Sequence, residues 1–209
     1  MSDVMSVIRE KRIVPVVKLE RAEDALPLAK ALMDGGLPVA EVTFRTAAAK
    51  EAIRLIRAEY PDMLCGAGTV VNIEQAEEAA EAGAAFIVSP GFSKEVIEFA
   101  VRKNIPVLPG CCTPTEIIEA MRYNLKVVKF FPAKQYGGLE TIKALAAPFP
   151  GIRFMPTGGI SAQNLREYLD NEVIYACGGS WMVSEKLILE KRFDEITRLT
   201  KEAVELAKR

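Results

Sequence analysis

The chain has 209 residues, half of them hydrophobic and 26% charged, which is the balance of a globular protein with one core, so we expect a single domain over residues 1–209. Its formal net charge of -1, without any local basic run, argues against binding to nucleic acid. The sequence contains no histidine, which excludes Ser-His-Asp and Cys-His catalysis and histidine-based zinc sites.

Short β-branched runs alternate with amphipathic helical segments along the whole chain. The expected strands are Ile13–Val17, Val39–Phe44, Leu64–Ala67, Phe86–Ser89, Pro106–Pro109, Val127–Phe131, Arg153–Pro156 and Val173–Cys177. The expected helices are Ala22–Gly35, Ala47–Tyr60, Ile73–Ala82, Lys94–Lys103, Pro114–Tyr123, Leu139–Ala147, Ala162–Leu169 and Asp194–Lys208, two of them with N-caps at Thr113 and Ser161.

This order of elements predicts a compact α/β fold, a (β/α)8 TIM barrel with parallel strands. The competing architecture is an open doubly wound sheet, which would usually carry a glycine-rich phosphate turn after its first strand. Here Lys18 and Leu19 follow that strand, and the glycines come late in the chain. On a barrel, polar residues at the carboxyl ends of the strands are the candidates for a site.

The second and sixth strands each place polar residues on the face opposite their apolar residues. Period-two alternation puts Glu41, Thr43 and Arg45 on one face, which must point inward because the apolar face packs on helices. The same argument turns Lys129 and Phe131 inward, so Glu41 and Lys129 can approach one another. A lysine kept dry by Phe131 favours the neutral amine that forms a Schiff base. A solvated strand-end lysine and a structural ion pair are the alternative interpretations.

Two glycine-rich turns follow the last two expected strands. They are Thr157-Gly158-Gly159-Ile160-Ser161 and Gly178-Gly179-Ser180-Trp181. Barrels often bind a phosphate at these two loops, where backbone amides can approach the ligand closely. The alternative is turn geometry that merely needs glycine.

Three further residues border the same end of the predicted barrel. Lys18 ends the first strand and could add charge to the phosphate, although such a lysine is more often only solvated. Thr69 follows the third strand and Pro90 the fourth. Alone, both are ordinary loop residues.

The remaining composition points to no metal, membrane or disulfide. The four cysteines form no C-x-x-C pattern, so we interpret them as buried thiols. No stretch is long and apolar enough for a signal peptide or a membrane span, and we expect a cytoplasmic protein.

Taken together, six motifs resemble the bacterial 2-keto-3-deoxy-6-phosphogluconate (KDPG) aldolases, which also act as 4-hydroxy-2-oxoglutarate (KHG) aldolases. The match runs over nearly the whole chain, and the sequence around Lys129 is its most specific part. The motifs are Glu41-Val42-Thr43-Phe44-Arg45-Thr46, Gly66-Ala67-Gly68-Thr69, Ser89-Pro90-Gly91, Lys129-Phe130-Phe131-Pro132-Ala133, Pro156-Thr157-Gly158-Gly159-Ile160 and Gly178-Gly179-Ser180-Trp181.

The resemblance implies a (β/α)8 homotrimer that needs neither metal nor cofactor and cleaves a phosphorylated 2-keto acid to pyruvate and D-glyceraldehyde 3-phosphate. It also implies cleavage of KHG to pyruvate and glyoxylate. The pyruvate-end residues serve both substrates, so neither the preference between them nor the stereochemistry at C4 follows. From the residues alone, a phosphate-binding barrel isomerase and a non-enzymatic barrel scaffold stay open.

The resemblance also implies a role for each matched residue. Lys129 is the Schiff-base lysine, Glu41 transfers protons, and Arg45 with Thr69 binds the pyruvate carboxylate. Lys18 falls where family members vary. The pocket and phosphate contacts implied by the resemblance are Pro90, Phe131, Thr157, Gly158, Gly159, Gly179 and Ser180.

Overall fold

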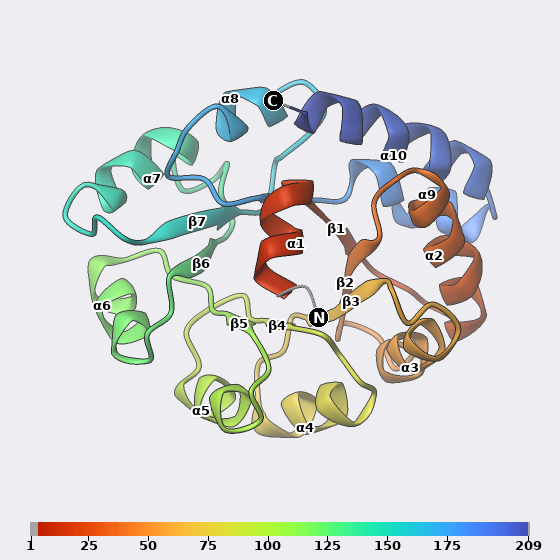
Figure 1. Ribbon diagram of the computed structural model, residues 1–209, viewed down its shortest axis with the longest axis horizontal. Helices are drawn as coiled ribbons and strands as arrows, with labels where there is room; N and C mark the ends of the chain where they lie inside the picture. Colours follow the sequence, from red (N-terminus) through yellow and green to blue (C-terminus); the bar gives the residue numbers. More distant parts are fainter. Residues whose placement is uncertain (1–3, 209) are drawn as a thin grey trace.

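The computed structural model describes residues 4–208 and has an α/β architecture, with strands at the centre and helices around them (Figure 1). The strands are β1 (Ile13–Val17), β2 (Val39–Thr43), β3 (Leu64–Gly68), β4 (Ile87–Val88), β5 (Val107–Leu108), β6 (Val127–Phe130), β7 (Arg153–Pro156) and β8 (Cys177–Gly179). The helices are α1 (Val4–Lys11), α2 (Ala25–Asp34), α3 (Ala49–Glu59), α4 (Ile73–Glu81), α5 (Lys94–Arg102), α6 (Pro114–Arg122), α7 (Gly138–Ala146), α8 (Leu165–Leu169), α9 (Glu185–Leu189) and α10 (Phe193–Ala207), with 3-10 turns η1 (Ala22–Asp24) and η2 (Trp181–Val183).

The strands pair in parallel in two sheets, which confirms the predicted α/β class. One sheet has six strands in the order β5-β4-β3-β2-β1-β8, and the other pairs β6 with β7. Single parallel bridges join the sheets on both sides, from Gly110 to Lys129 and from Thr157 to Gly178. The amide of Lys129 donates to the carbonyl of Pro109 at 2.8 Å, and its own carbonyl accepts from Cys111 at 2.9 Å.

Helix boundaries follow from capping residues. The Thr113 hydroxyl accepts the amide of Glu116, whose carboxylate accepts the amide of Thr113, so the predicted N-cap of α6 is confirmed as a capping box. The predicted cap at Ser161 is wrong. The side chain of Asn164 accepts the amide of Ser161 at 2.8 Å instead, and α8 begins only at Leu165.

The last strand differs from its prediction over Val173–Cys177. Ile174 makes only one bridge, to Phe154, whereas the ladder with β1 runs from Cys177 to Gly179. Glycine is required in this strand because neighbours fill the space above it. A Cβ on Gly178 would lie 2.3 Å from the Thr157 hydroxyl, and one on Gly179 would lie 2.0 Å from the Trp181 ring.

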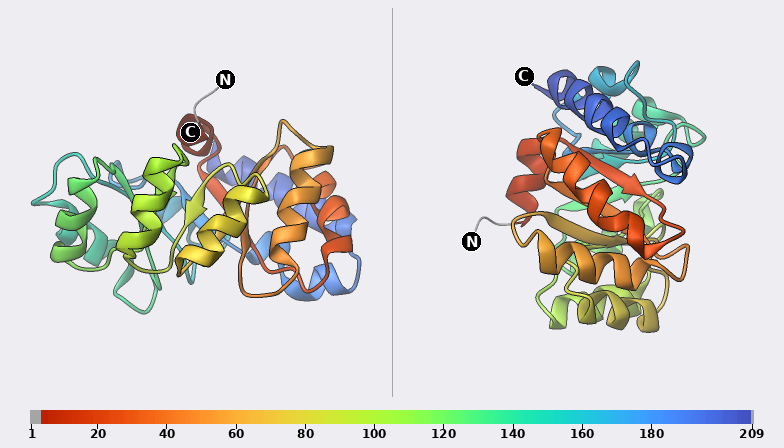
Figure 2. Two further views of the ribbon diagram at one scale, coloured as in Figure 1. Left: turned by 90° about the horizontal axis from the view of Figure 1, so that it is seen from below. Right: turned by 90° about the vertical axis from the view of Figure 1, so that its right-hand side faces the viewer.

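Helices α1 and α9 have no counterpart among the expected elements. Helix α1 is short, and Ile8 is its only fully buried residue, so it carries little apolar periodicity. It lies across the end of the strands at which β1 begins (Figures 1 and 2). Helix α9 has five residues. No helix within residues 4–208 is long and apolar enough to cross a membrane.

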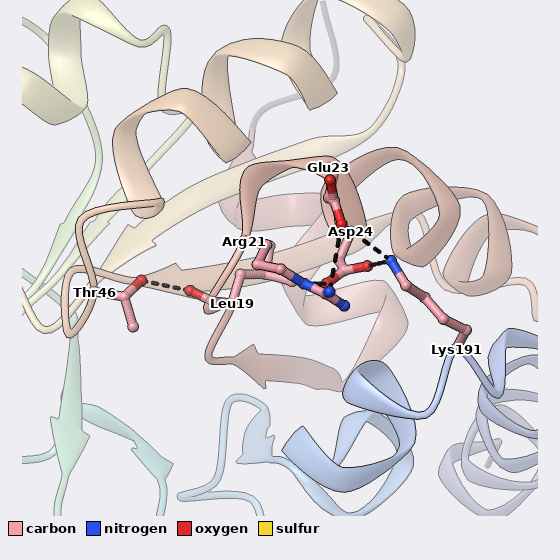
Figure 3. Close-up of polar contacts among 6 residues, drawn as sticks. All are labelled: Leu19, Arg21, Glu23, Asp24, Thr46 and Lys191. Carbon is pink, nitrogen blue, oxygen red and sulfur yellow. Dashed lines mark hydrogen bonds and ion pairs between the residues drawn. The ribbon is translucent and has the colours of Figure 1, made fainter.

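A buried carboxylate, Asp24, ties the segment after β1 to the segment after α9 (Figure 3). Asp24 is fully buried, and it accepts the Nε of Arg21 at 3.0 Å and a hydrogen bond from the Nζ of Lys191. Lys191 also pairs with Glu23 at 3.5 Å. Because the two cations are about half exposed, they keep contact with water while the carboxylate depends on them.

We predict that Asp24→Ala lowers the free energy of unfolding by about 2 kcal/mol, since it removes charge-assisted hydrogen bonds within a packed corner. Asp34→Ala is the matched control, because Asp34 pairs with Lys30 at an exposed surface and should contribute less than about 0.5 kcal/mol. Urea unfolding curves measure both. Equal midpoints for the two variants would show that the Asp24 cluster contributes no particular stability.

Candidate active site

Lys129 and Glu41 form an ion pair inside the fold. Lys129 lies on β6 and Glu41 on β2, which belong to different sheets, so their contact spans the interior between them. The Nζ of Lys129 lies 3.2 Å from the Oε1 of Glu41, and the two side chains are 5% and 0% exposed. The structure thus places them together, as the strand periodicity predicts.

Space for this carboxylate comes from a glycine on the neighbouring strand. Gly68 on β3 pairs in register with Thr43, and a Cβ on Gly68 would lie 2.2 Å from the Oε1 of Glu41. The other carboxylate oxygen, Oε2, is buried and has no hydrogen-bond partner among residues 4–208. Gly68 was not a candidate site residue, because the expected strand ended at Ala67, whereas β3 extends to Gly68.

The ring of Phe131 lies beside the lysine amine. Its centroid is 5.5 Å from the Nζ of Lys129. The expectation that Phe131 points inward holds only in part, because the side chain is 38% exposed. The ring lies beside the buried amine and also lines a cavity.

A cavity of about 150 Å³ opens next to this ring. Seven of the predicted binding residues line it, and so do three that were not predicted. Val16 could have been found, because it shares a strand face with Lys18 by period-two alternation. The lining residues are Arg45, Phe131, Thr157, Gly158, Gly159, Gly179 and Ser180, together with Val16, Ile160 and Gly178.

Thr69 and Pro90 are not among the lining residues of this cavity. Both are half-buried in the loops after β3 and β4. Thr69 has a left-handed backbone with φ of 57°. The carbonyl of Pro90 packs so closely on Gly110 that a Cβ there would lie 2.1 Å from it. Their contribution to ligand binding therefore stays a prediction.

The two glycine-rich segments differ in structure. Gly158 and Gly159 have φ of 96° and 79°, so the first segment is a turn that needs glycine. Gly179 lies within β8, and the exposed Ser180 follows it. Both segments nevertheless border the cavity.

The buried hydroxyl of Thr157, in the wall of this cavity, makes no hydrogen bond with the described residues. Thr157 is 7% exposed, and its Oγ1 has no hydrogen-bond partner among the described residues. Buried hydroxyls are normally satisfied, so an unpaired one in a cavity wall is available to a ligand.

Lys18 is held by carboxylates and does not line the cavity. Its Nζ lies 2.6 Å from Glu20 and 3.1 Å from Glu185. Hydrogen bonds, first to Glu20 and then to Glu185, raise the pKa of Lys18. Lys18 therefore stays positively charged, and these two carboxylates already neutralise its charge.

Arg45 lines the cavity, and its guanidinium has a fixed partner at one nitrogen. Its Nε donates to the hydroxyl of Thr43 at 3.1 Å, and that hydroxyl donates to the carbonyl of Val17 at 2.9 Å. Within residues 4–208, the hydrogen bond from Nε to Thr43 is the only polar contact of the Arg45 guanidinium, so its terminal nitrogens can receive an anionic ligand.

The thiols play a packing role. Cys65, Cys111 and Cys177 are buried, as predicted, and desolvation raises the pKa of Cys65 to about 12. Cys112 is half-buried and donates to the carbonyl of Phe131 at 3.2 Å. In the described part of the chain, no three His, Cys, Asp or Glu side chains are arranged to hold a metal ion.

This arrangement is suited to covalent chemistry on a small anionic carbonyl compound. An amine beside a carboxylate can attack a carbonyl carbon and exchange protons with it. An arginine fork can hold a carboxylate, and glycine-rich backbone can hold a phosphate. Arg45 and both glycine-rich segments line one cavity, and Phe131 connects that cavity with the buried pair, although neither Lys129 nor Glu41 is among the lining residues.

Comparison with known proteins identifies the family. Residues 4–199 match the family model described as KDPG and KHG aldolase. A 2-dehydro-3-deoxy-phosphogluconate aldolase of Treponema pallidum is 46% identical over 206 residues, covering 99% of this chain and 98% of that protein.

Solved structures agree with that match. The KDPG aldolase of Legionella pneumophila, with pyruvate captured at low pH as a covalent carbinolamine intermediate, superposes with a TM-score of 0.92 at 39% identity, covering 95% of this chain and 97% of that one. The KDPG aldolase of Zymomonas mobilis ZM4 with 3-phosphoglycerate superposes with a TM-score of 0.88 at 40% identity, covering 97% and 95%. The chain therefore belongs to the KDPG and KHG aldolase family.

Proposed function

We propose that this protein is a class I aldolase that cleaves KDPG to pyruvate and D-glyceraldehyde 3-phosphate, and KHG to pyruvate and glyoxylate. The observation that carries the proposal is the buried pair of Lys129 and Glu41, which lies beside Phe131, a residue that lines the same cavity as Arg45. The covalent pyruvate adduct in the Legionella pneumophila relative supports the same chemistry.

Lys129 starts the reaction as a nucleophile. Glu41 first accepts a proton from the Lys129 ammonium, and the neutral amine then attacks the C2 ketone. The protonated Glu41 returns this proton to the hydroxyl that leaves as water, so a protonated imine forms. The imine withdraws electrons from the bond between C3 and C4. Glu41, directly or through one water, takes the proton of the C4 hydroxyl as that bond breaks, and the aldehyde leaves. The remaining enamine is protonated at C3, and hydrolysis of the imine returns the free lysine and pyruvate.

The cavity residues orient the substrate around this lysine. Arg45, assisted by Thr69, binds the keto-acid carboxylate, and Pro90 with Phe131 shapes the pyruvate end. The turn of Gly158 and Gly159 and the segment of Gly179 and Ser180 bind the phosphate. The unpaired Thr157 hydroxyl is available to a substrate hydroxyl between these two ends.

We also propose that the strands close into a (β/α)8 barrel that forms one domain over residues 1–209. The bridges from Gly110 to Lys129 and from Thr157 to Gly178 support closure, because they link the two sheets on both sides. Homotrimer assembly and a cytoplasmic location stay predictions. Size-exclusion chromatography with light scattering measures the assembly.

Borohydride reduction in the presence of pyruvate tests the nucleophile. The unmodified protein should gain one pyruvate adduct that peptide mass spectrometry maps to Lys129, and Lys129→Met should gain none. Lys126→Met is the matched control, because Lys126 is exposed and lies three positions away, and it should label normally. An adduct on another lysine would contradict the assignment, and no adduct at all would favour a phosphate-binding isomerase.

Glu41→Gln tests the proton-transfer role. We expect the imine with pyruvate to form while the kcat of cleavage falls by about 100-fold, the size typical of a lost general base. Glu20→Gln removes an exposed carboxylate at the same end of the strands and should leave kcat unchanged. Steady-state cleavage assays measure both, and an unchanged kcat in Glu41→Gln would remove Glu41 from the mechanism.

Ser180→Ala tests the phosphate site, because only KDPG carries a phosphate. We expect kcat/KM for KDPG to fall about tenfold, as for a lost hydrogen bond to a charged group. The value for KHG should stay within about twofold. Measurement of both substrates on one preparation provides the control. Equal losses on the two substrates would show that Ser180 does not act through the phosphate.

A further inference from the structure

We propose that Thr43 is a positioning residue that makes Arg45 meet the substrate carboxylate through its two terminal nitrogens. The inference rests on the proposed function, because it concerns how Arg45 holds the keto acid. Thr43 lies on β2 two residues before Arg45, and its side chain points toward the interior, where it is 1% exposed.

The Thr43 hydroxyl can serve Arg45 only as an acceptor. A hydroxyl has one proton, and Thr43 donates it to the carbonyl of Val17 at 2.9 Å. Its lone pairs therefore remain for the Nε of Arg45, which donates at 3.1 Å. Since the β-branched side chain is stiff and buried, this acceptor has a fixed position.

The backbone that carries Arg45 is also attached on both sides. The hydroxyl of Thr46 donates to the carbonyl of Leu19, as Figure 3 shows, and the amide of Phe44 donates to the carbonyl of Gly68 at 2.7 Å. The segment that contains Leu19 continues to the buried Asp24 cluster (Figure 3). The backbone around Arg45 is thus held by hydrogen bonds on both sides, and only the terminal nitrogens of its side chain are left to bind a ligand.

Occupation of Nε restricts how Arg45 can bind a carboxylate. A guanidinium offers two parallel pairs of N–H groups, one formed by both terminal nitrogens and one that includes Nε. With Nε engaged by Thr43, the pair on the terminal nitrogens remains, and Arg45 is one of the residues that line the cavity. The carboxylate is therefore held end-on, which fixes where the C2 carbonyl lies relative to Lys129.

The test compares Thr43→Val, which keeps the shape but removes the hydroxyl, with Thr43→Ser, which restores it. For Thr43→Val we expect the pyruvate concentration that half-saturates borohydride trapping to rise on the order of tenfold, as for a weakened charge-assisted contact. KM for KDPG should rise in parallel, while kcat changes less than about threefold. Thr43→Ser should recover most of the affinity.

Thr200→Val is the matched control for loss of a buried threonine hydroxyl. Thr200 is fully buried on α10 and donates only to the carbonyl of Ile196 at 2.7 Å, away from the cavity wall. The free energy of unfolding of Thr200→Val should fall by about as much as that of Thr43→Val, but Thr200→Val should bind pyruvate normally. Urea unfolding of both variants separates stability from binding.

A double-mutant comparison shows whether Thr43 acts through Arg45. In an Arg45→Ala background, Thr43→Val should cause no further rise in the half-saturating pyruvate concentration. A full additional rise there, or an unchanged value in Thr43→Val alone, overturns the inference while leaving the aldolase function in place. If the unmodified protein forms no pyruvate adduct, both the proposed function and the inference fail.

Discussion

The ion pair between Lys129 and Glu41 is the interaction on which the rest of the site depends. Removing two charges from water costs free energy that their mutual attraction often fails to recover, so such a pair adds little stability beyond what apolar residues would supply. Here one carboxylate oxygen is left without a partner as well, which increases that cost. Such an arrangement suits chemistry better than stability, because an amine and a carboxylate in contact can form and resolve an imine.

Two glycines leave the space that polar side chains of the site occupy. Gly68 leaves the space that the Glu41 carboxylate occupies, and Gly178 leaves the space beside the Thr157 hydroxyl. The end of β1 then supports the arginine at the cavity, since the carbonyls of Val17 and Leu19 receive the hydroxyls on either side of Arg45. The proposed nucleophile on β6 and the proposed carboxylate-binding Arg45 after β2 thus come from different sheets.

Strand periodicity was enough to predict the central part of this site. Alternation along β2 and β6 places Glu41 and Lys129 inside once helices are taken to cover the apolar face, because a two-residue period then leaves only one consistent inward face. It failed at β8, where β-branched residues at 173–174 suggested a strand and the glycines actually form it. Hydrogen bonds across strands, such as that of Thr43 to Val17, depend on the register between β1 and β2, which local patterns do not contain. The positions of Thr69 and Pro90 relative to the cavity depend on loop conformation, which local sequence patterns do not contain either.

A crystal structure of the protein cooled after exposure to pyruvate tests the central claim most directly. The account predicts continuous electron density between the Nζ of Lys129 and C2 of pyruvate, with the pyruvate carboxylate on the terminal nitrogens of Arg45 and Glu41 beside the new bond. Density that leaves Lys129 paired only with Glu41, while pyruvate is bound to another lysine or lies away from Arg45, would contradict it.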